Sequence, residues 1–398
     1  MRKAFVKYLF LAGIVSLSAC RSDEPTRPTA DFGQLTVMSS TPYDSIGRTD
    51  ALCDITIEGE KFHYYETNAA IHLRGNSTAQ RPKHPFLLKL HSEPALFHMP
   101  SAKSWVLLPD YIDRTLLRSA LAFRLGADSK LLWSPRWHFV EMSFNGEAKG
   151  PHVLCEKVQV HPNRVRLPYN GWLVEIDAWT LPSDISFTIP HIERPVHVHY
   201  PYDSVPTPET ESIKALFSKA DEVLFSANFT DFNEGWRRYL DEESWIDWFW
   251  INEISKNNDA FFFSSCFMHS GPDGRIVMGP IWDFDLAFGN TSTNGSDSPE
   301  GWYIRNVMWY TRLFEDPSFA TAAKQRFDWF YARKQLYLDF VRSNARMMKP
   351  HADANNEIWH NYTQQIAASP NMFETYDEHV DALIAWLEQR FEWIKANL

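Results

Sequence analysis

The sequence predicts an α+β fold, with strands concentrated in the N-terminal half and helices in the C-terminal half. From about residue 34 to 90, apolar and polar residues alternate within short runs such as Leu35-Thr36-Val37-Met38 and Ile55-Thr56-Ile57. Turn residues separate these runs, and such a pattern is typical of β-strands. From about residue 242 to the end, the pattern is mainly helical. Hydrophobic residues make up 44% and charged residues 22% of the 398 residues, which is the balance of an ordered globular protein.

The N-terminus is expected to be an export signal that ends at a lipidated cysteine. A basic stretch up to Lys7 is followed by an apolar run too short to span a bilayer, and then by Leu17-Ser18-Ala19-Cys20. This arrangement resembles a bacterial lipobox, in which cleavage leaves the cysteine linked to lipid. We therefore expect a signal peptide at 1–19, a flexible tether at 20–33 and one folded domain at 34–398.

This prediction places the protein in the cell envelope, attached to the outer membrane through a lipid anchor at Cys20. The sequence leaves open whether the domain faces the periplasm or the cell exterior. The chain carries 39 Lys and Arg against 50 Asp and Glu residues, a formal net charge of −11. Because nucleic-acid binding needs a basic surface, we expect no nucleic-acid partner.

Between these two regions, the sequence predicts two further helices and three further strands. Asp113 is placed to cap a helix whose apolar face includes Leu117 and Leu121, and Gly126 is expected to end it. Thr207-Pro208-Glu209 predicts the start of another helix, with proline at the first helical position. Strand-like segments are expected at His138–Phe144, followed by an Asn-Gly turn, and at His152–Val160 and Gly171–Ile176.

The segment 252–290 carries the strongest chemical signal. A Trp-rich helix is expected to end near Asp259, followed by a strand of about ten residues, the turn Gly271-Pro272-Asp273-Gly274 and a second strand running into Trp282-Asp283-Phe284-Asp285. Such a hairpin brings Asp259 near Asp283, and a continuing strand would place Asp283 and Asp285 on one face. Converging carboxylates repel one another unless a cation lies between them. We therefore expect the carboxylates to bind Mg²⁺, with phosphate oxygens filling the rest of its coordination shell.

A polar, glycine-containing turn lies upstream of this segment. It comprises Arg74-Gly75-Asn76-Ser77-Thr78 and precedes a stretch that contains Lys83 and Lys89. A turn followed by a strand that bears lysine can present backbone amides and a cation to phosphates. We therefore take Arg74, Asn76 and Ser77 as candidate nucleotide-binding residues.

These segments belong to a longer series of motifs, which resembles the CotH family of spore-coat-protein-H-like atypical kinases. The resemblance spans about residues 50–300, and its most specific part is the string Gly-Pro-x-Trp-Asp-Phe-Asp-x-x-Phe-Gly-Asn at 279–290. The other matching motifs are Arg74-Gly75-Asn76-Ser77 with Lys83 and Phe86, Asp113 with Arg118, and Glu156-Lys157.

The resemblance implies a divergent protein-kinase-like fold. It further implies binding of ATP and Mg²⁺ and transfer of the γ-phosphate to Ser or Thr of protein substrates. By position, Asp283 would be a metal ligand and Asp259 the catalytic aspartate. Either Lys83 or Lys89 would contact phosphates.

Two details of the resemblance concern neighbouring positions. Glu156 would face the nucleotide or support the phosphate-binding lysine. Some family members have an Asn in the strand after the catalytic aspartate, where this chain reads Phe263-Ser264-Ser265-Cys266. If that Asn binds a second metal, Asp285 must replace it.

Two other functional classes remain open at this stage. A catalytically inactive, kinase-fold module that binds an unknown ligand at the cell surface fits the lipobox, the tether and the missing Asn. A glycoside hydrolase would need two carboxyl groups flanking a sugar cleft that has no lysine cluster.

A zinc site on His197 and His199, which share a strand face, lacks an evident third ligand.

Overall fold

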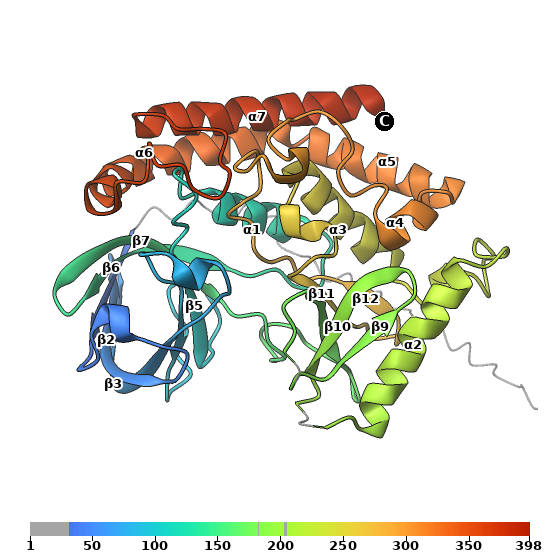
Figure 1. Ribbon diagram of the computed structural model, residues 1–398, viewed down its shortest axis with the longest axis horizontal. Coiled ribbons are helices and arrows are strands. Elements are labelled where there is room, and N and C mark those ends of the chain that lie inside the picture. Colours follow the sequence, from blue (N-terminus) through green and yellow to red (C-terminus); the bar gives the residue numbers. More distant parts are fainter. Residues whose placement is uncertain (1–31, 182, 203–204) are drawn as a thin grey trace, which may run out of the picture.

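Seven strands of the N-terminal half close into a barrel (Figure 1). The computed structural model describes residues 32–181, 183–202 and 205–398, so Cys20 and the signal peptide predicted at 1–19 lie outside the described residues. Hydrogen bonding runs in the order β1-β2-β3-β4-β5-β7-β6, and parallel pairing of β1 with β6 closes the ring. The strands are β1 (Gly33–Met38), β2 (Ala51–Gly59), β3 (Phe62–Leu73), β4 (Phe86–Lys89), β5 (Ser104–Leu108), β6 (Trp137–Phe144) and β7 (Glu147–Glu156).

The barrel interior explains the alternation seen in the sequence. Successive side chains of a strand point to opposite faces, and the inward positions Leu35, Val37, Ile55 and Ile57 are fully buried. These residues belong to one hydrophobic cluster inside the barrel. The predicted strands of the region 34–90 are confirmed.

A second sheet of five strands lies beside the barrel (Figure 1). Its order is β12-β11-β8-β10-β9, and all of its neighbouring strands are antiparallel. The strands are β8 (Leu173–Ile176), β9 (Ser186–Ile189), β10 (Ile192–Tyr200), β11 (Cys266–Ser270) and β12 (Ile276–Met278). The hairpin β11–β12 turns at Gly271–Gly274 as predicted, because the Gly271 amide bonds the Arg275 carbonyl.

Helices dominate the rest of the chain. Most of them lie above the two sheets, whereas α2 runs beside the second sheet (Figure 1). The predicted start of α2 is confirmed, since Thr207 forms a capping box and Pro208 is the first helical residue. The helices are α1 (Arg118–Asp128), α2 (Pro208–Leu224), α3 (Glu242–Ser255), α4 (Met308–Leu313), α5 (Pro317–Tyr331), α6 (Lys334–Trp359) and α7 (Tyr376–Asn397). Among the described residues, no helix is both long and apolar enough to cross a membrane.

The helix α3 is anchored at its C-terminal end by a buried ion pair. Glu253 and Arg390 are both fully buried, and their side chains lie 2.6 Å apart. The second carboxylate oxygen of Glu253 accepts the backbone amide of Ile304 at 2.8 Å. The pair therefore connects α3, α7 and the loop before α4, and it fixes the position of the C-terminal end of α3.

Several sequence-based boundaries were wrong. The strand expected at 152–160 is β7 and ends at Glu156, and β11 has five residues rather than about ten.

Two further differences have identifiable reasons. Gly126 does not end α1, which continues to Asp128. A Cβ atom at Gly126 would lie 2.3 Å from Ser134 Oγ and 2.7 Å from Ile281 Cδ1. Glycine is therefore needed there for close packing. The second hairpin strand ends at Met278 rather than continuing through Asp285. Pro280 follows, and its missing N–H prevents continuation of the strand ladder.

Three cysteines lie in the interior of the part of the chain that the structure describes. Cys53, Cys155 and Cys266 are all buried and none of them forms a disulfide. They occupy interior positions as small apolar side chains.

Candidate functional site

A cavity of about 740 Å³ lies where the barrel, the second sheet and the loops beneath the helices meet. Residues at the ends of β3 and β5 line it from the barrel, and residues of β8 line it from the second sheet. The loop before α1 and the loop after β12 complete its walls. Its lining includes six of the predicted site residues, which are Arg74, Asn76, Ser77, Asp259, Asp283 and Asp285.

Asp259 is held by a tight turn at the end of α3. The helix ends at Ser255, and the next residue, Lys256, caps it in a left-handed conformation with φ 46°. The short 3-10 helix Asn258–Ala260 follows. The Asn257 side chain accepts the backbone amide of Asp259 at 3.3 Å. Burial raises the pKa of the Asp259 carboxyl well above its ordinary value, and the negative charge of Asp283 raises it further.

Asp283 and Asp285 lie in the loop that follows the hairpin. Their placement does not come from strand alternation, because Asp283 has φ 65°, a conformation that few residues other than glycine adopt. The Asn290 side chain donates to the Asp285 carbonyl at 2.7 Å and to the Ile112 carbonyl at 3.0 Å. This amide bridge holds the loop in the conformation that turns both carboxyl groups to the cavity.

The electrostatics of the loop reflect crowding of like charges. Burial raises the pKa of Asp285 well above its ordinary value, and the negative charges of Asp283 and Asp110 add to the effect. Burial also raises the pKa of Asp283, whereas the positive charge of Arg74 acts in the opposite direction. The site therefore favours a bound cation, which would relieve this repulsion.

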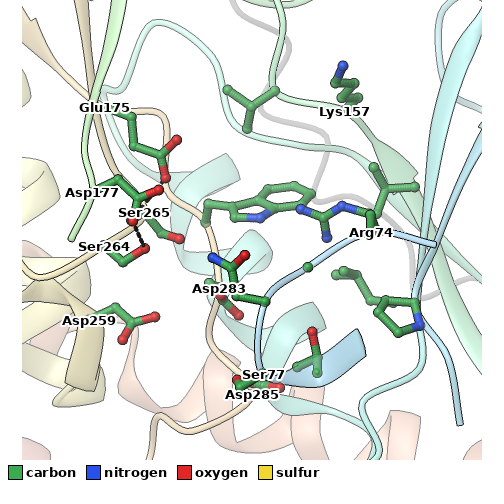
Figure 2. A pocket seen from close by; sticks show the side chains of 18 of the residues that line it. Arg74, Ser77, Lys157, Glu175, Asp177, Asp259, Ser264, Ser265, Asp283 and Asp285 are labelled. Atoms are coloured by element: carbon green, nitrogen blue, oxygen red, sulfur yellow. Dashed lines mark hydrogen bonds between the residues drawn. The ribbon is translucent and has the colours of Figure 1, made fainter. Parts of the chain in front are cut away.

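The positive side of the cavity is formed by Arg74 and Lys157 (Figure 2). The Arg74 guanidinium carbon lies 5.2 Å from the ring centroid of Trp282, within the range of a cation–π contact. The Gly75 carbonyl accepts a hydrogen bond from Arg48 at 2.6 Å, which holds the predicted turn against the barrel. Figure 2 shows Arg74 extending toward the side of the cavity where Asp283 lies.

Three residues predicted from the resemblance lie outside the cavity lining. Lys83 is fully buried, and its ammonium group donates to the Pro151 carbonyl and to Asn355 Oδ1. Lys89 forms an ion pair with Asp50, 2.9 Å away, at the barrel surface. The structure therefore does not bring either lysine to the carboxylates.

Glu156 also lies outside the cavity lining and is bound by another side chain. Its carboxylate accepts hydrogen bonds from the Arg136 side chain at 3.0 and 3.1 Å. The neighbouring Lys157 lines the cavity instead, and the motif Glu156-Lys157 was the available signal for it. Burial lowers the pKa of Lys157, and the positive charge of Arg74 lowers it further.

A second acidic group on the opposite wall was missed by the sequence analysis. Asp177 accepts a hydrogen bond from Ser264 Oγ at 2.8 Å, and Glu175 accepts the Ser265 amide at 3.1 Å (Figure 2). Glu175 also lies 2.6 Å from His199 Nε2. The segment Phe263–Cys266, which lacks the expected Asn, thus uses its serines to orient these two acids. Glu175 and Asp177 are two residues apart at the end of β8, and this spacing could have indicated that both face the cavity.

The histidines considered for zinc have other partners. His197 and His199 do share a face, with ring centroids 4.3 Å apart, but His199 pairs with Glu175. His191, which directly precedes β10, lies 2.9 Å from Asp221. Within residues 32–181, 183–202 and 205–398, no three or more His, Cys, Asp or Glu side chains are arranged to hold a metal ion.

The donor set nevertheless fits one kind of metal. Mg²⁺ prefers oxygen ligands and is usually held in proteins by one or two carboxylates, with water and substrate phosphates in the remaining positions. Asp283 and Asp285 supply such a pair in a cavity that also contains Arg74 and Lys157. A site of this kind needs no third protein ligand.

Comparison with known proteins identifies one family. The profile of the family described as CotH kinase protein matches residues 71–394, which is most of the chain. The match includes the turn at Arg74, Asp259 and the loop with Asp283 and Asp285. No curated protein matches the sequence.

Proposed function

The chain belongs to the CotH kinase protein family, and on that premise we propose that it is an ATP- and Mg²⁺-dependent kinase that phosphorylates Ser or Thr of protein substrates. The observation that carries the proposal is the cavity itself, in which Asp259, Asp283 and Asp285 face Arg74 and Lys157. Phosphoryl transfer depends on positioning and on charge neutralisation, and this lining supplies groups for both. The proposal includes a divergent protein-kinase-like fold, with the barrel and the helical half on either side of the nucleotide.

In this proposal, the basic side of the cavity binds the phosphates. Arg74 is oriented by its contact with Trp282, and a guanidinium can donate two parallel hydrogen bonds to phosphate oxygens. Lys157 adds a second positive charge, and Asn76 and Ser77 add polar groups from the turn. These residues take the role that the resemblance assigned to Lys83 or Lys89.

The acidic side would hold the metal and the acceptor. Asp283 and Asp285 would bind Mg²⁺, which when present neutralises the charge that develops on the transferred phosphoryl group. Asp259 would accept the proton of the substrate hydroxyl as its oxygen forms a bond to the γ-phosphorus and the bond to the ADP oxygen breaks. A carboxyl group whose pKa is raised by burial is better suited to accept that proton than an exposed one.

The proposed location of the protein is the cell envelope. Cys20 would carry the lipid that attaches the protein to the outer membrane. Replacement by Cys20→Ser should release the protein from the membrane fraction, and mass spectrometry of the wild type should detect the lipid. A membrane-bound mutant together with an unlipidated wild type would contradict the anchor.

Nucleotide binding and transfer test the function directly. Protein lacking residues 1–20 should gain thermal stability with ATP and Mg²⁺ together, because a ligand that binds only the folded state raises its stability. Radiolabelled ATP should label the protein itself or an acceptor protein. Absence of both the stabilisation and the labelling would favour the alternative, a catalytically inactive surface-binding module with the same fold.

A further inference from the structure

Arg48 is a positively charged residue of the cavity lining that the proposed function does not use. It lies between the short 3-10 helix Tyr43–Ser45 and the strand β2, and it is exposed. The family profile begins to match at residue 71, so Arg48 precedes the matched region. The position and contacts of Arg48 are therefore features of this chain rather than of the family profile.

The segment that carries Arg48 is fixed to the barrel. Ile46 is only 3% exposed and belongs to the hydrophobic cluster inside the barrel. The Gly47 carbonyl accepts the backbone amide of Leu73, at the end of β3, at 2.7 Å. One guanidinium nitrogen of Arg48 donates to the Gly75 carbonyl at 2.6 Å. These contacts hold the Arg48 side chain beside the turn that forms the basic side of the cavity.

Arg48 forms no ion pair in the part of the chain that the structure describes, although an acidic residue is only two positions away. That residue, Asp50, lies 2.6 Å from His72 Nδ1 and 2.9 Å from Lys89 Nζ, so its carboxylate has other partners. A guanidinium group has five N–H donors, and the hydrogen bond to Gly75 uses one of them. Arg48 therefore keeps donors and an unpaired charge for a ligand.

Arg48 lines the same cavity as the two other cations, Arg74 and Lys157. Burial lowers the pKa of Arg74; the charge of Asp283 opposes this shift, and the charge of Arg48 adds to it. Burial and the charge of Arg74 likewise lower the pKa of Lys157. Positive charges that lower one another's pKa values are stabilised by an anion between them. The protein as a whole has a formal net charge of −11, so three cations gathered at one cavity favour a polyanionic ligand.

We propose that Arg48 is a further phosphate-binding residue, which donates to the phosphate chain of the nucleotide at the mouth of the cavity. Arg48 is exposed whereas Arg74 is half-buried, so Arg48 would bind a phosphate group nearer to solvent and Arg74 one deeper in the cavity. A guanidinium can donate two parallel hydrogen bonds to phosphate oxygens. The inference rests on the proposed function in so far as the phosphates belong to ATP, but binding of inorganic tripolyphosphate can be measured without a nucleotide and without phosphate transfer.

The test compares Arg48→Gln with the wild type by titration calorimetry, using ATP, inorganic tripolyphosphate and adenosine, each with Mg²⁺. Affinity for ATP and for tripolyphosphate should fall by about 5- to 20-fold, since the variant loses a charge-assisted hydrogen bond at an exposed position. Affinity for adenosine, which has no phosphate, should not change. The matched control Arg346→Gln removes the same charge from an exposed position of α6 outside the cavity lining, and it should bind all three as the wild type does.

Salt distinguishes a direct contact with phosphate from an effect on the shape of the turn. If the charge of Arg48 meets the phosphates, the difference in affinity between Arg48→Gln and the wild type should shrink as KCl is raised from about 50 to about 500 mM. A change in the shape of the turn would leave that difference the same. Arg48→Lys keeps the charge but loses the forked donors, so its affinity should lie between those of the other two proteins.

The outcomes separate this inference from the proposed function. Unchanged affinity for ATP and tripolyphosphate in Arg48→Gln, or a difference that does not respond to salt, overturns Arg48 as a phosphate ligand and leaves the kinase proposal in place. Tripolyphosphate binding that depends on Arg48, in a protein that transfers no phosphate, supports the phosphate ligand and contradicts the kinase. A wild type that binds neither ATP nor tripolyphosphate overturns both. If Arg48→Gln fails to fold, the same comparison with Arg48→Lys decides the question.

Discussion

Arg74 lies over the indole ring of Trp282, with its guanidinium carbon 5.2 Å from the ring centroid. Arg74 follows the barrel strand β3, whereas Trp282 lies directly before Asp283 in the loop after β12. The contact therefore joins the barrel to the acidic loop across the cavity. It also places a cation beside Asp283, whose pKa the Arg74 charge lowers against the larger, opposite effect of burial.

Replacing Arg74 by glutamine should weaken nucleotide binding. The change Arg74→Gln removes the charge and the forked donors, and hydrogen bonds to charged groups contribute about 1.5–3 kcal/mol. Affinity for ATP with Mg²⁺ should fall by about 10- to 100-fold, measured by titration calorimetry, since about 1.4 kcal/mol corresponds to a tenfold change.

The matched control for this experiment is Lys83→Met. Lys83 bonds Pro151 and Asn355 in the interior, so its loss should lower the free energy of unfolding by about 1–3 kcal/mol and leave nucleotide affinity nearly unchanged. The opposite pattern, with affinity lost in Lys83→Met and kept in Arg74→Gln, would restore the lysine as the phosphate ligand.

Asp259→Asn should separate binding from chemistry. The amide keeps the shape of the side chain but loses the charge and basicity, so ATP affinity should stay within a few-fold. Transfer of radiolabelled phosphate should fall by about 10²–10⁴, the usual contribution of a positioned base. Equal, non-zero labelling of mutant and wild type would remove Asp259 from the reaction.

Asp283→Ala should abolish the Mg²⁺ dependence of nucleotide binding and leave the fold intact. The lost side chain is a proposed metal ligand, and its removal also relieves repulsion with Asp259 and Asp285. Thermal shift with ATP, with and without Mg²⁺, measures the effect. Asp44→Ala, at a side chain that is 90% exposed, should behave as the wild type. A metal titration that Asp283→Ala leaves unchanged counts against the assignment.

Acid should destabilise the protein through His269. Burial lowers the pKa of this β11 side chain from 6.5 to about 4. Between these values the unfolded chain binds more protons than the folded one, so stability is full above pH 6.5 and falls as the pH drops toward 4. The contribution lost is about 3 kcal/mol, at 1.36 kcal/mol for each pH unit.

Urea denaturation at several pH values checks this slope. His269→Gln cannot gain a proton and should show a shallower loss of stability between pH 6.5 and 4. His63→Gln, at a side chain that is 65% exposed, should keep the wild-type slope. An identical slope in all three proteins would show that His269 does not control the acid transition.

The α+β class, the strands of the first half, the capped start of α2 and the turn of the hairpin β11–β12 could all be predicted from the sequence. These features follow from local rules, such as the period-two burial of Leu35 and Val37 and the cap at Thr207. The sequence also predicted that Asp259, Asp283 and Asp285 lie near one another, and all three line the same cavity.

Which positively charged side chains lie near those carboxylates could not be predicted from the sequence, because it depends on tertiary packing. Lys83 and Lys89 lie on the same short segment, yet packing buries one against Asn355 and leaves the other at the surface with Asp50. Lys157 and Asp110 reach the cavity because they follow the ends of β7 and β5, two strands from separate parts of the chain. Local spacing predicts the shape of a segment, but contacts between distant segments set the surroundings of each charge, and those surroundings determine what the charge can bind.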